Sequence, residues 1–210
     1  MTRPRVVVVD SGVDAGHPAL RDRVHVVAGP SFGPDGAAED AAGGRDDLGH
    51  GSSVAATIAA FVDELELVSL KVFERDAVCD FGAVLHALRH ALRYDAVCIN
   101  LSLGTTSLRY RDELQEVVAE AKQNGARLVA PASYGGLPCD PGTLPGVEGV
   151  VADSNVPPMV PELRRHGDRF IWFASPLPPR DADGGRKLMS RGDSLAVAAV
   201  SGLLARTPDA

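Results

Sequence analysis

The sequence predicts an α/β fold in which a doubly wound, mostly parallel sheet carries helices on both faces. Residues 6–9 (VVVV) form an unbroken β-branched run, which is typical of a strand buried on both faces. Further apolar runs alternate with segments of helical character, the order expected for a parallel sheet. The 210 residues, 45% of them hydrophobic, suffice for one sizeable core but are few for two domains. We therefore expect a single domain over residues 1–206 and a frayed tail at 207–210.

Each predicted strand is a short apolar run bounded by polar or glycine-containing segments. The run at 24–27 is the weakest of them, and residues 28–49, rich in Gly, Asp, Ala and Pro, predict a long surface loop. The strands are expected at residues 6–9, 24–27, 65–72, 96–104, 127–131, 149–152 and 169–173.

The predicted helices differ in character. Residues 54–62 and 194–205 consist of small and aliphatic residues and indicate helices buried on most sides. Asp80 is a suitable N-cap for a helix that reaches residue 92, and an Asn-Gly pair closes the amphipathic segment 108–123. A loop rich in Pro, Asp and Gly at 176–185 leads to the last helix.

Composition excludes several classes of function. A net charge of −7 gives no electrostatic support for nucleic-acid binding, and no apolar run is long enough to span a membrane. The N-terminus lacks the pattern of a signal peptide, which favours a cytoplasmic protein. His86 and His90 have a spacing that suits metal ligands, but no third ligand accompanies them, so we expect neither a metal site nor a cofactor. An odd number of cysteines without a CxxC pair argues against a disulfide framework: Cys79, Cys98 and Cys139.

Three residues with complementary chemistry stand where predicted elements end or begin. Asp10 follows the first strand, His50 precedes the helix at 54–62, and Ser194 precedes the last helix. A serine hydroxyl needs a general base to attack a carbonyl, and neutral imidazole suits pH 7. The imidazole in turn needs a carboxylate that fixes its tautomer and stabilises its charged form. The chain order Asp, His, Ser is one of the known orders of this triad.

Other interpretations of these residues exist. Ser194 and the preceding Asp193 are also typical N-cap residues. A doubly wound signalling or nucleotide-binding domain would use Asp10 and Lys71 at strand tips. The sequence lacks the glycine-rich phosphate loop that a nucleotide site of this kind needs.

Four segments resemble motifs of the subtilisin-like serine proteases, the subtilases. Residues 7–14 (VVVDSGVD) resemble the family's aspartate motif, and residues 49–55 (GHGSSVA) resemble its histidine motif. Residues 99–104 (INLSLG) match its substrate-binding strand, and residues 192–196 (GDSLA) resemble its nucleophile motif. The motifs and the elements between them occur in the family's order, so the resemblance covers nearly the whole chain. It implies a subtilisin-like fold in a short variant, without a propeptide and truncated at the C-terminus.

The resemblance also implies an activity. Ser194 would be the nucleophile, His50 the general base and Asp10 its orienting partner in a serine endopeptidase that forms an acyl-enzyme. The small size suggests a specific peptide or precursor peptide as the substrate. With only sixteen residues after Ser194, a homodimer or a partner chain would cover apolar surface on the truncated C-terminal side.

The resemblance assigns the substrate-binding residues as well. Ser102, Leu103 and Gly104 would pair with the backbone of an extended substrate, which gains affinity from main-chain hydrogen bonds. Ala132 and Ser133, at the tip of the strand at 127–131, would line the first specificity pocket.

The sequence departs from the family at the oxyanion hole, where Tyr134 replaces the usual Asn. Loss of such a donor typically costs about 10²–10³ in turnover. Three interpretations follow. The hydroxyl of Tyr134 or Ser133 donates instead, or the Ser194 N–H acts alone, or the chain is a catalytically impaired peptide-binding or scaffold protein. The intact triad argues against the last of these, because a binding protein has no chemical need for it.

Overall fold

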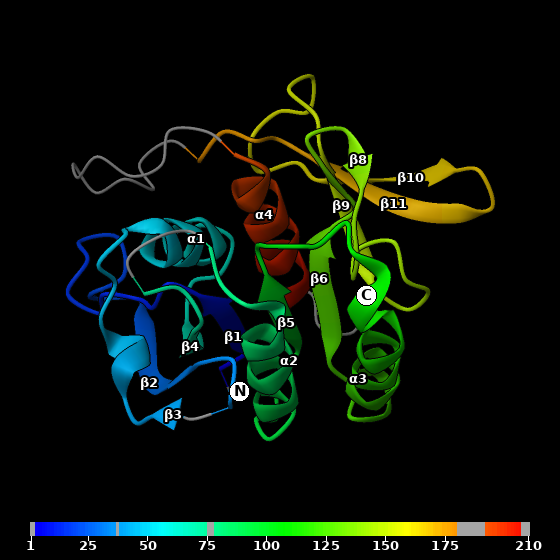
Figure 1. Cartoon of the computed structure of the whole chain (residues 1–210). Helices are drawn as coiled ribbons and strands as arrows, with labels where there is room; N and C mark the ends of the chain where they lie inside the picture. Colours follow the sequence, from blue (N-terminus) through cyan, green and yellow to red (C-terminus); the bar gives the residue numbers. More distant parts are fainter. Residues whose placement is uncertain (1–2, 37, 75–77, 180–191, 207–210) are drawn as a thin grey trace.

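A nine-stranded sheet forms the centre of the molecule, with helices packed on both of its faces (Figure 1). The computed structural model describes residues 3–36, 38–74, 78–179 and 192–206. The strand order is β10-β11-β9-β6-β5-β1-β4-β2-β3. All neighbouring strands from β11 to β2 pair in parallel, and only the edge strands β10 and β3 are antiparallel to their neighbours in the described sheet. The predicted α/β class with a mostly parallel, doubly wound sheet is confirmed.

The bounds of the elements are as follows. The sheet contains β1 (Arg5–Asp10), β2 (Val24–Phe32), β3 (Ala38–Glu39), β4 (Leu65–Lys71), β5 (Cys98–Leu101), β6 (Arg127–Pro131), β9 (Glu148–Ala152), β10 (Glu162–His166) and β11 (Arg169–Ala174). A separate hairpin consists of β7 (Ser133–Tyr134) and β8 (Leu137–Pro138). The α-helices are α1 (His50–Ala59), α2 (Phe81–Ala91), α3 (Arg111–Gln123) and α4 (Asp193–Arg206), and the 3₁₀ segments are η1 (Ala42–Gly44) and η2 (Leu108–Tyr110).

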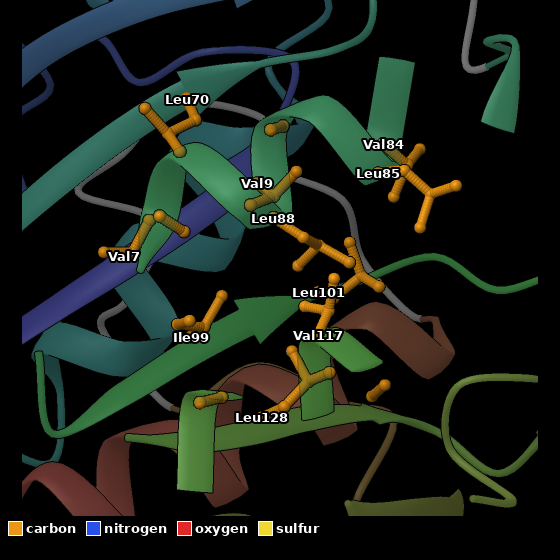
Figure 2. Packing of buried hydrophobic residues seen from close by; sticks show 14 of the residues in the cluster. Val7, Val9, Leu70, Val84, Leu85, Leu88, Ile99, Leu101, Val117 and Leu128 are labelled. Atoms are coloured by element: carbon orange, nitrogen blue, oxygen red, sulfur yellow. The ribbon is translucent and has the colours of Figure 1, made fainter. Parts of the chain in front are cut away.

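The valine run of β1 explains the two-sided core. Alternate side chains of a strand point to opposite faces of the sheet. Val7 and Val9 pack with Leu88 of α2 and with residues of α3 (Figure 2), whereas Val6 and Val8 pack with residues of α1 and α4. All four valines are fully buried, because β1 lies in the middle of the sheet and both of its faces are covered.

Helices α1 and α4 lie side by side on one face of the sheet (Figure 1). Gly202 of α4 allows their close approach, since a Cβ at this position would come within 2.8 Å of the Ile58 carbonyl oxygen. The first turns of both helices therefore lie near the carboxyl ends of the central strands. Sites of open α/β sheets form at this edge.

The structure corrects the prediction for residues 24–49. The strand expected at 24–27 continues to Phe32 as β2, and β3 and η1 also lie in the segment that we expected to be a loop. The register of β2 against β4 shifts between Ala28 and Ser31. Gly29 sits in this irregularity, where a Cβ would come within 2.8 Å of the Ser69 carbonyl oxygen. Glycine and proline thus mark a bulge in a strand here, not the end of the strand.

Other element boundaries also differ from the prediction. Helix α1 begins at His50, four residues earlier than expected, so His50 lies inside the first helical turn. Strands β7, β8 and β10 had no clear signal, because two are only two residues long and β10 (ELRRH) is a polar edge strand. Residues 180–185 of the expected loop and the expected frayed tail at 207–210 lie outside the described residues.

Candidate active site

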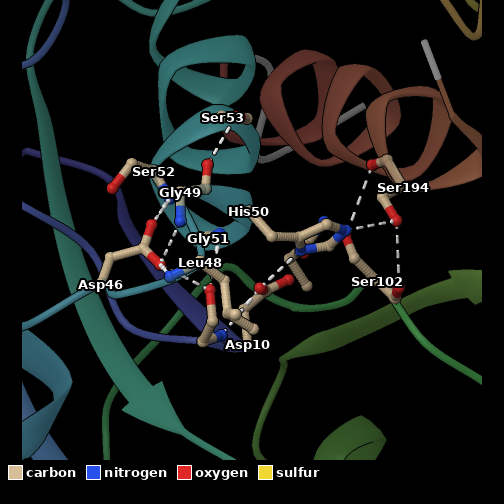
Figure 3. A network of polar contacts seen from close by, with 12 residues as sticks. Asp10, Asp46, Leu48, Gly49, His50, Gly51, Ser52, Ser53, Ser102 and Ser194 are labelled. Atoms are coloured by element: carbon tan, nitrogen blue, oxygen red, sulfur yellow. Dashed lines mark hydrogen bonds and ion pairs between the residues drawn. The ribbon is translucent and has the colours of Figure 1, made fainter. Parts of the chain in front are cut away.

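The structure brings Asp10, His50 and Ser194 together in a chain of hydrogen bonds (Figure 3). Asp10 is the last residue of β1, His50 the first of α1 and Ser194 the second of α4. The Nδ1 atom of His50 lies 2.6 Å from Asp10 Oδ1, and its Nε2 atom lies 3.0 Å from Ser194 Oγ. With Nδ1–H donating to the carboxylate, Nε2 is left as the acceptor that a serine hydroxyl requires.

The carboxylate at the start of this chain is buried. Asp10 is 1% exposed, and its Oδ1 also accepts the Ser11 N–H at 2.7 Å. Its Oδ2 has no hydrogen-bond partner among the residues that the structure describes. A buried carboxylate of this kind interacts strongly with the one cationic partner that it can have, which is the protonated ring of His50.

The pKa of His50 is raised above its ordinary value. Burial of the ring acts to lower the pKa, but the hydrogen bond to Asp10 and the charges of Asp10 and Asp46 raise it more strongly. The ring is therefore protonated below this raised pKa and becomes a free base as the pH rises through it. Any activity that needs neutral His50 is expected to appear only above the raised value.

Ser194 faces a cavity of about 580 Å³ at the carboxyl ends of the strands. Its hydroxyl also lies 3.2 Å from the Ser102 carbonyl oxygen. Because Ser194 is in the first turn of α4, its N–H has no acceptor within the helix, and the positive end of the helix dipole points at the site. The residues that line the cavity are His50, Phe73, Val78, Cys79, Phe81, Ser102, Leu103, Gly104, Pro131, Tyr134, Gly192, Asp193 and Ser194.

The expected substrate-binding residues fall into two groups. Ser102, Leu103 and Gly104 line the cavity with Ser194, and so does Tyr134, which is 67% exposed. Ala132 is buried and Ser133 is half-buried in the β7–β8 hairpin, and neither belongs to the residues that line this cavity.

Cys139 packs against the ends of β5 and β6. Its thiol donates to the Pro131 carbonyl oxygen at 3.1 Å, and a Cβ on Gly104 would come within 3.0 Å of its Sγ. No pattern in the sequence predicts this contact. Cys79, in contrast, lines the cavity, but burial and the nearby charges of Asp80 and Asp10 raise its pKa to about 11, so it stays a thiol at neutral pH.

A buried polar network ties β5 to α4 behind the nucleophile. Ser102 Oγ donates to Asn100 Oδ1 at 2.9 Å, and Asn100 Nδ2 donates to Ser201 Oγ, also at 2.9 Å. Ser201 Oγ donates to the Val197 carbonyl oxygen one turn earlier in α4. The sequence signal for this network is a polar side chain in an apolar strand and another in an apolar helix, and no sequence pattern links the two.

Lys71 has a structural role at its strand tip. Its ammonium is buried and donates to the Arg45 carbonyl oxygen at 3.1 Å and to Asp47 at 3.3 Å. It therefore anchors the loop that precedes His50. Among the described residues, no group of three or more His, Cys, Asp or Glu side chains is arranged to hold a metal ion, and no helix is long and apolar enough to cross a membrane.

A larger cavity of about 760 Å³ lies at the opposite edge of the sheet, at the amino ends of the strands. Its lining includes Arg5 and Val97 but none of the candidate site residues. The chemistry of the triad therefore belongs to the smaller cavity.

A parallel α/β sheet that brings an aspartate, a histidine and a serine into hydrogen-bond sequence is the architecture of one class of serine proteases. Comparison with known families defines the class further. The chain belongs to the subtilase family, whose family model matches residues 2–135, well over half of the chain. Ser194 lies beyond the matched segment, so its assignment rests on the motif at 192–196 and on the contact with His50.

Individual relatives agree with this family. The major intracellular serine protease of Bacillus subtilis (strain 168) is 32% identical over 143 residues, which cover 63% of this chain and 43% of that protein. The thermostable alkaline protease of Halalkalibacterium halodurans is 31% identical over 141 residues, which cover 63% of this chain and 36% of that protein. The chain thus matches less than half the length of these curated relatives.

Solved structures show the same fold. A lanthipeptide protease superposes with a TM-score of 0.68 at 19% identity, over 96% of this chain and 72% of that one. The prenylagaramide maturation protease PagA has a TM-score of 0.68 at 20% identity, over 97% and 74% of the two chains. A psychrophilic protease has a TM-score of 0.70 at 23% identity, over 100% and 79%.

Proposed function

We propose that the chain is a serine endopeptidase that works through an acyl-enzyme. The observation that carries this proposal is the continuous chain of contacts from Asp10 through His50 to Ser194, at 2.6 Å and 3.0 Å, in a member of the subtilase family.

The chemistry follows from this geometry. Ser194 Oγ attacks the scissile carbonyl while His50 Nε2 takes its proton, and the same nitrogen then donates that proton to the leaving amine. Asp10 stabilises the imidazolium that forms between these two steps. Water, activated by His50 in the same way, then hydrolyses the acyl-enzyme and releases the free serine.

The substrate is proposed to be an extended peptide that lies along Ser102, Leu103 and Gly104. These residues follow strand β5 and line the cavity in front of Ser194, so a peptide backbone here would pair with their main chain beyond the end of that strand. Ala132 and Ser133 are proposed from the resemblance as residues of the first specificity pocket, although they are not among the residues that line this cavity.

We also propose that the enzyme cleaves a specific peptide or precursor peptide and that it acts in the cytoplasm. Two proteins of the same fold are named as a lanthipeptide protease and a prenylagaramide maturation protease, and two relatives are named as intracellular serine proteases. These names describe those proteins, and they favour a dedicated processing role here. A single domain over 1–206, with a homodimer or partner chain on the C-terminal side, stays part of the proposal.

A mixture of unrelated peptides, followed by mass spectrometry, tests the proposal. We expect the wild-type protein to cut a small set of peptides at reproducible bonds, and the Ser194→Ala variant to cut none of them. Absence of any cleavage by folded wild-type protein, at enzyme concentrations close to those of the peptides, would count against an endopeptidase.

One observation favours a second candidate, a catalytically impaired peptide-binding or scaffold protein. Tyr134 stands where the family has its oxyanion Asn, and its side chain is exposed. We favour a donor role for this hydroxyl, because Tyr134 lines the cavity together with Ser194, whereas Ser133 does not.

The Tyr134→Phe variant tests this donor role. We expect kcat to fall by about 10²-fold with little change in KM, because one oxyanion donor is lost and substrate binding is retained. Steady-state kinetics on a cleaved peptide measures this change. Tyr134→Asn, which restores an amide donor at this position, is the matched control and should recover most of the activity. Equal kcat in wild type and Tyr134→Phe would assign the oxyanion to backbone donors alone.

A further inference from the structure

Asp46 accepts four hydrogen bonds close to the triad, although the sequence places it in an unremarkable acidic loop. Its Oδ1 accepts from Ser11 Oγ at 2.8 Å, from the Leu48 N–H at 3.2 Å and from the Gly49 N–H at 2.8 Å. Its Oδ2 accepts from the Ser52 N–H at 2.8 Å. Figure 3 shows the carboxylate below the first turn of α1, directed at these donors.

These bonds join the two segments that carry Asp10 and His50. Ser11 is the residue after Asp10, and besides donating to Asp46 it accepts the Gly51 N–H at 3.0 Å. The residue after β1, the carboxylate of Asp46 and the first turn of α1 are thus joined in a closed ring of hydrogen bonds next to His50.

These hydrogen bonds supply the acceptors that the first turn of helix α1 needs. The residue before the helix is Gly49, which has a φ of 75° and no side chain to serve as a cap. The first N–H groups of a helix have no acceptor within the helix, so Asp46 and Ser11 supply acceptors from outside it. The turn also has no room to shift toward β1, since a Cβ on Gly51 would meet the Gly12 carbonyl oxygen at 2.1 Å.

We propose that Asp46 is a positioning residue for His50. Its carboxylate fixes the first turn of α1 against the end of β1 and so holds the imidazole in line between Asp10 and Ser194. The catalytic role of Asp46 rests on the proposed function, but the orientation of the His50 imidazole is measurable without any substrate.

The charge of Asp46 gives a second measurable quantity, the pKa of His50. It acts together with Asp10 to raise the pKa of His50, so its removal is expected to lower that pKa. Among the residues that the structure describes, the other titratable groups that line the cavity are Asp193 at the start of α4, Cys79 and Tyr134. All of them stay in place when Asp46 alone is changed.

Two variants and a matched control form the experiment. Asp46→Ala removes all four bonds, whereas Asp46→Asn keeps an oxygen acceptor and removes the charge. Asp47→Asn is the control, because it removes an equal charge from the next residue, whose half-exposed carboxylate contacts Lys71 and Arg45. The Asn side chain keeps an oxygen that accepts from Lys71, so the loop before His50 stays anchored. For each protein, NMR gives the pKa of His50 and the downfield Nδ1 proton, and labelling by a fluorophosphonate across pH gives the reactivity of Ser194.

We expect Asp46→Ala to lose the downfield Nδ1 signal and to label about 10²-fold more slowly, the loss expected from a small misalignment of a catalytic group. Asp46→Asn should move the His50 pKa and the acid limb of labelling to lower pH, because one charge that raises this pKa is removed. Asp47→Asn should change neither quantity.

Two results would overturn the proposal. One is an Asp46→Ala protein that folds with an unchanged Nδ1 signal and labelling rate. The other, decisive even if Asp46→Ala does not fold, is an Asp46→Asn protein indistinguishable from Asp47→Asn in both measurements. If wild-type protein does not label at all while the His50 signals respond as expected, the positioning role stands and the proposed function fails.

Discussion

Replacing His50 by Ala should lower kcat/KM for peptide cleavage by about 10⁶-fold, close to the loss expected for Ser194→Ala. Ser194 Oγ lies 3.0 Å from His50 Nε2, the nitrogen that is placed to take its proton. Without the imidazole the hydroxyl stays protonated at neutral pH, and the leaving amine has no proton donor. Steady-state kinetics on a peptide that the wild-type protein cleaves measures the loss, with thermal unfolding as a check on folding.

His25→Ala is the matched control for this variant. His25 lies on β2, and its exposed side chain is paired with Glu66, away from the cavity. Its loss should leave kcat/KM within about 2-fold, as expected for a surface substitution far from the reacting atoms. A His50→Ala protein that retained a hundredth or more of the wild-type activity would show that another group acts as the base.

The Asp10→Asn variant should lower kcat/KM by about 10⁴-fold at neutral pH. Asn has nearly the same shape as Asp, so the packing around this buried position is preserved. Its amide cannot stabilise an imidazolium, and its NH₂ group favours the tautomer in which Nδ1 is the acceptor and Nε2 carries the proton. The pKa of His50 should also fall, because the hydrogen bond and the charge that raise it are both removed.

A double variant tests whether Asp10 acts through the triad. Asp10→Asn combined with Ser194→Ala should be no less active than Ser194→Ala alone, because residues that act as a unit have strongly non-additive effects. A further loss in the double variant would assign Asp10 a role outside the triad, and an Asp10→Asn protein within 10-fold of wild type would give it no role in catalysis.

The sequence was sufficient to predict the α/β class and the residues of the candidate triad. Residues 6–9 are buried on both faces, and this leaves a plain signal in the form of consecutive valines. Asp10, His50 and Ser194 were found because each stands at the boundary of an element, in a motif with its own residue pattern. That His50 comes within 3.0 Å of both Asp10 and Ser194 follows from the topology, which places the end of β1 beside the first turns of α1 and α4.

The supporting residues were not predictable in the same way. Asp46 lies in a loop with other acidic residues, and only the fold shows that its two oxygens meet Ser11 and the first turn of α1. Cys139 and Pro131 come into contact through the chain that follows β6, and no periodic pattern records this. Contacts between loops depend on tertiary packing, whereas hydrophobic periodicity reports only which face of an element is buried.

The most direct test of the central claim, that Ser194 is the nucleophile of an Asp-His-Ser triad, is covalent labelling with a fluorophosphonate followed by mass spectrometry of the intact and digested protein. The account predicts one adduct per chain, located on Ser194, that forms on the wild-type protein and is absent from the Ser194→Ala and His50→Ala variants. A folded wild-type protein that takes up no label, or an adduct on another residue that persists in Ser194→Ala, would contradict it.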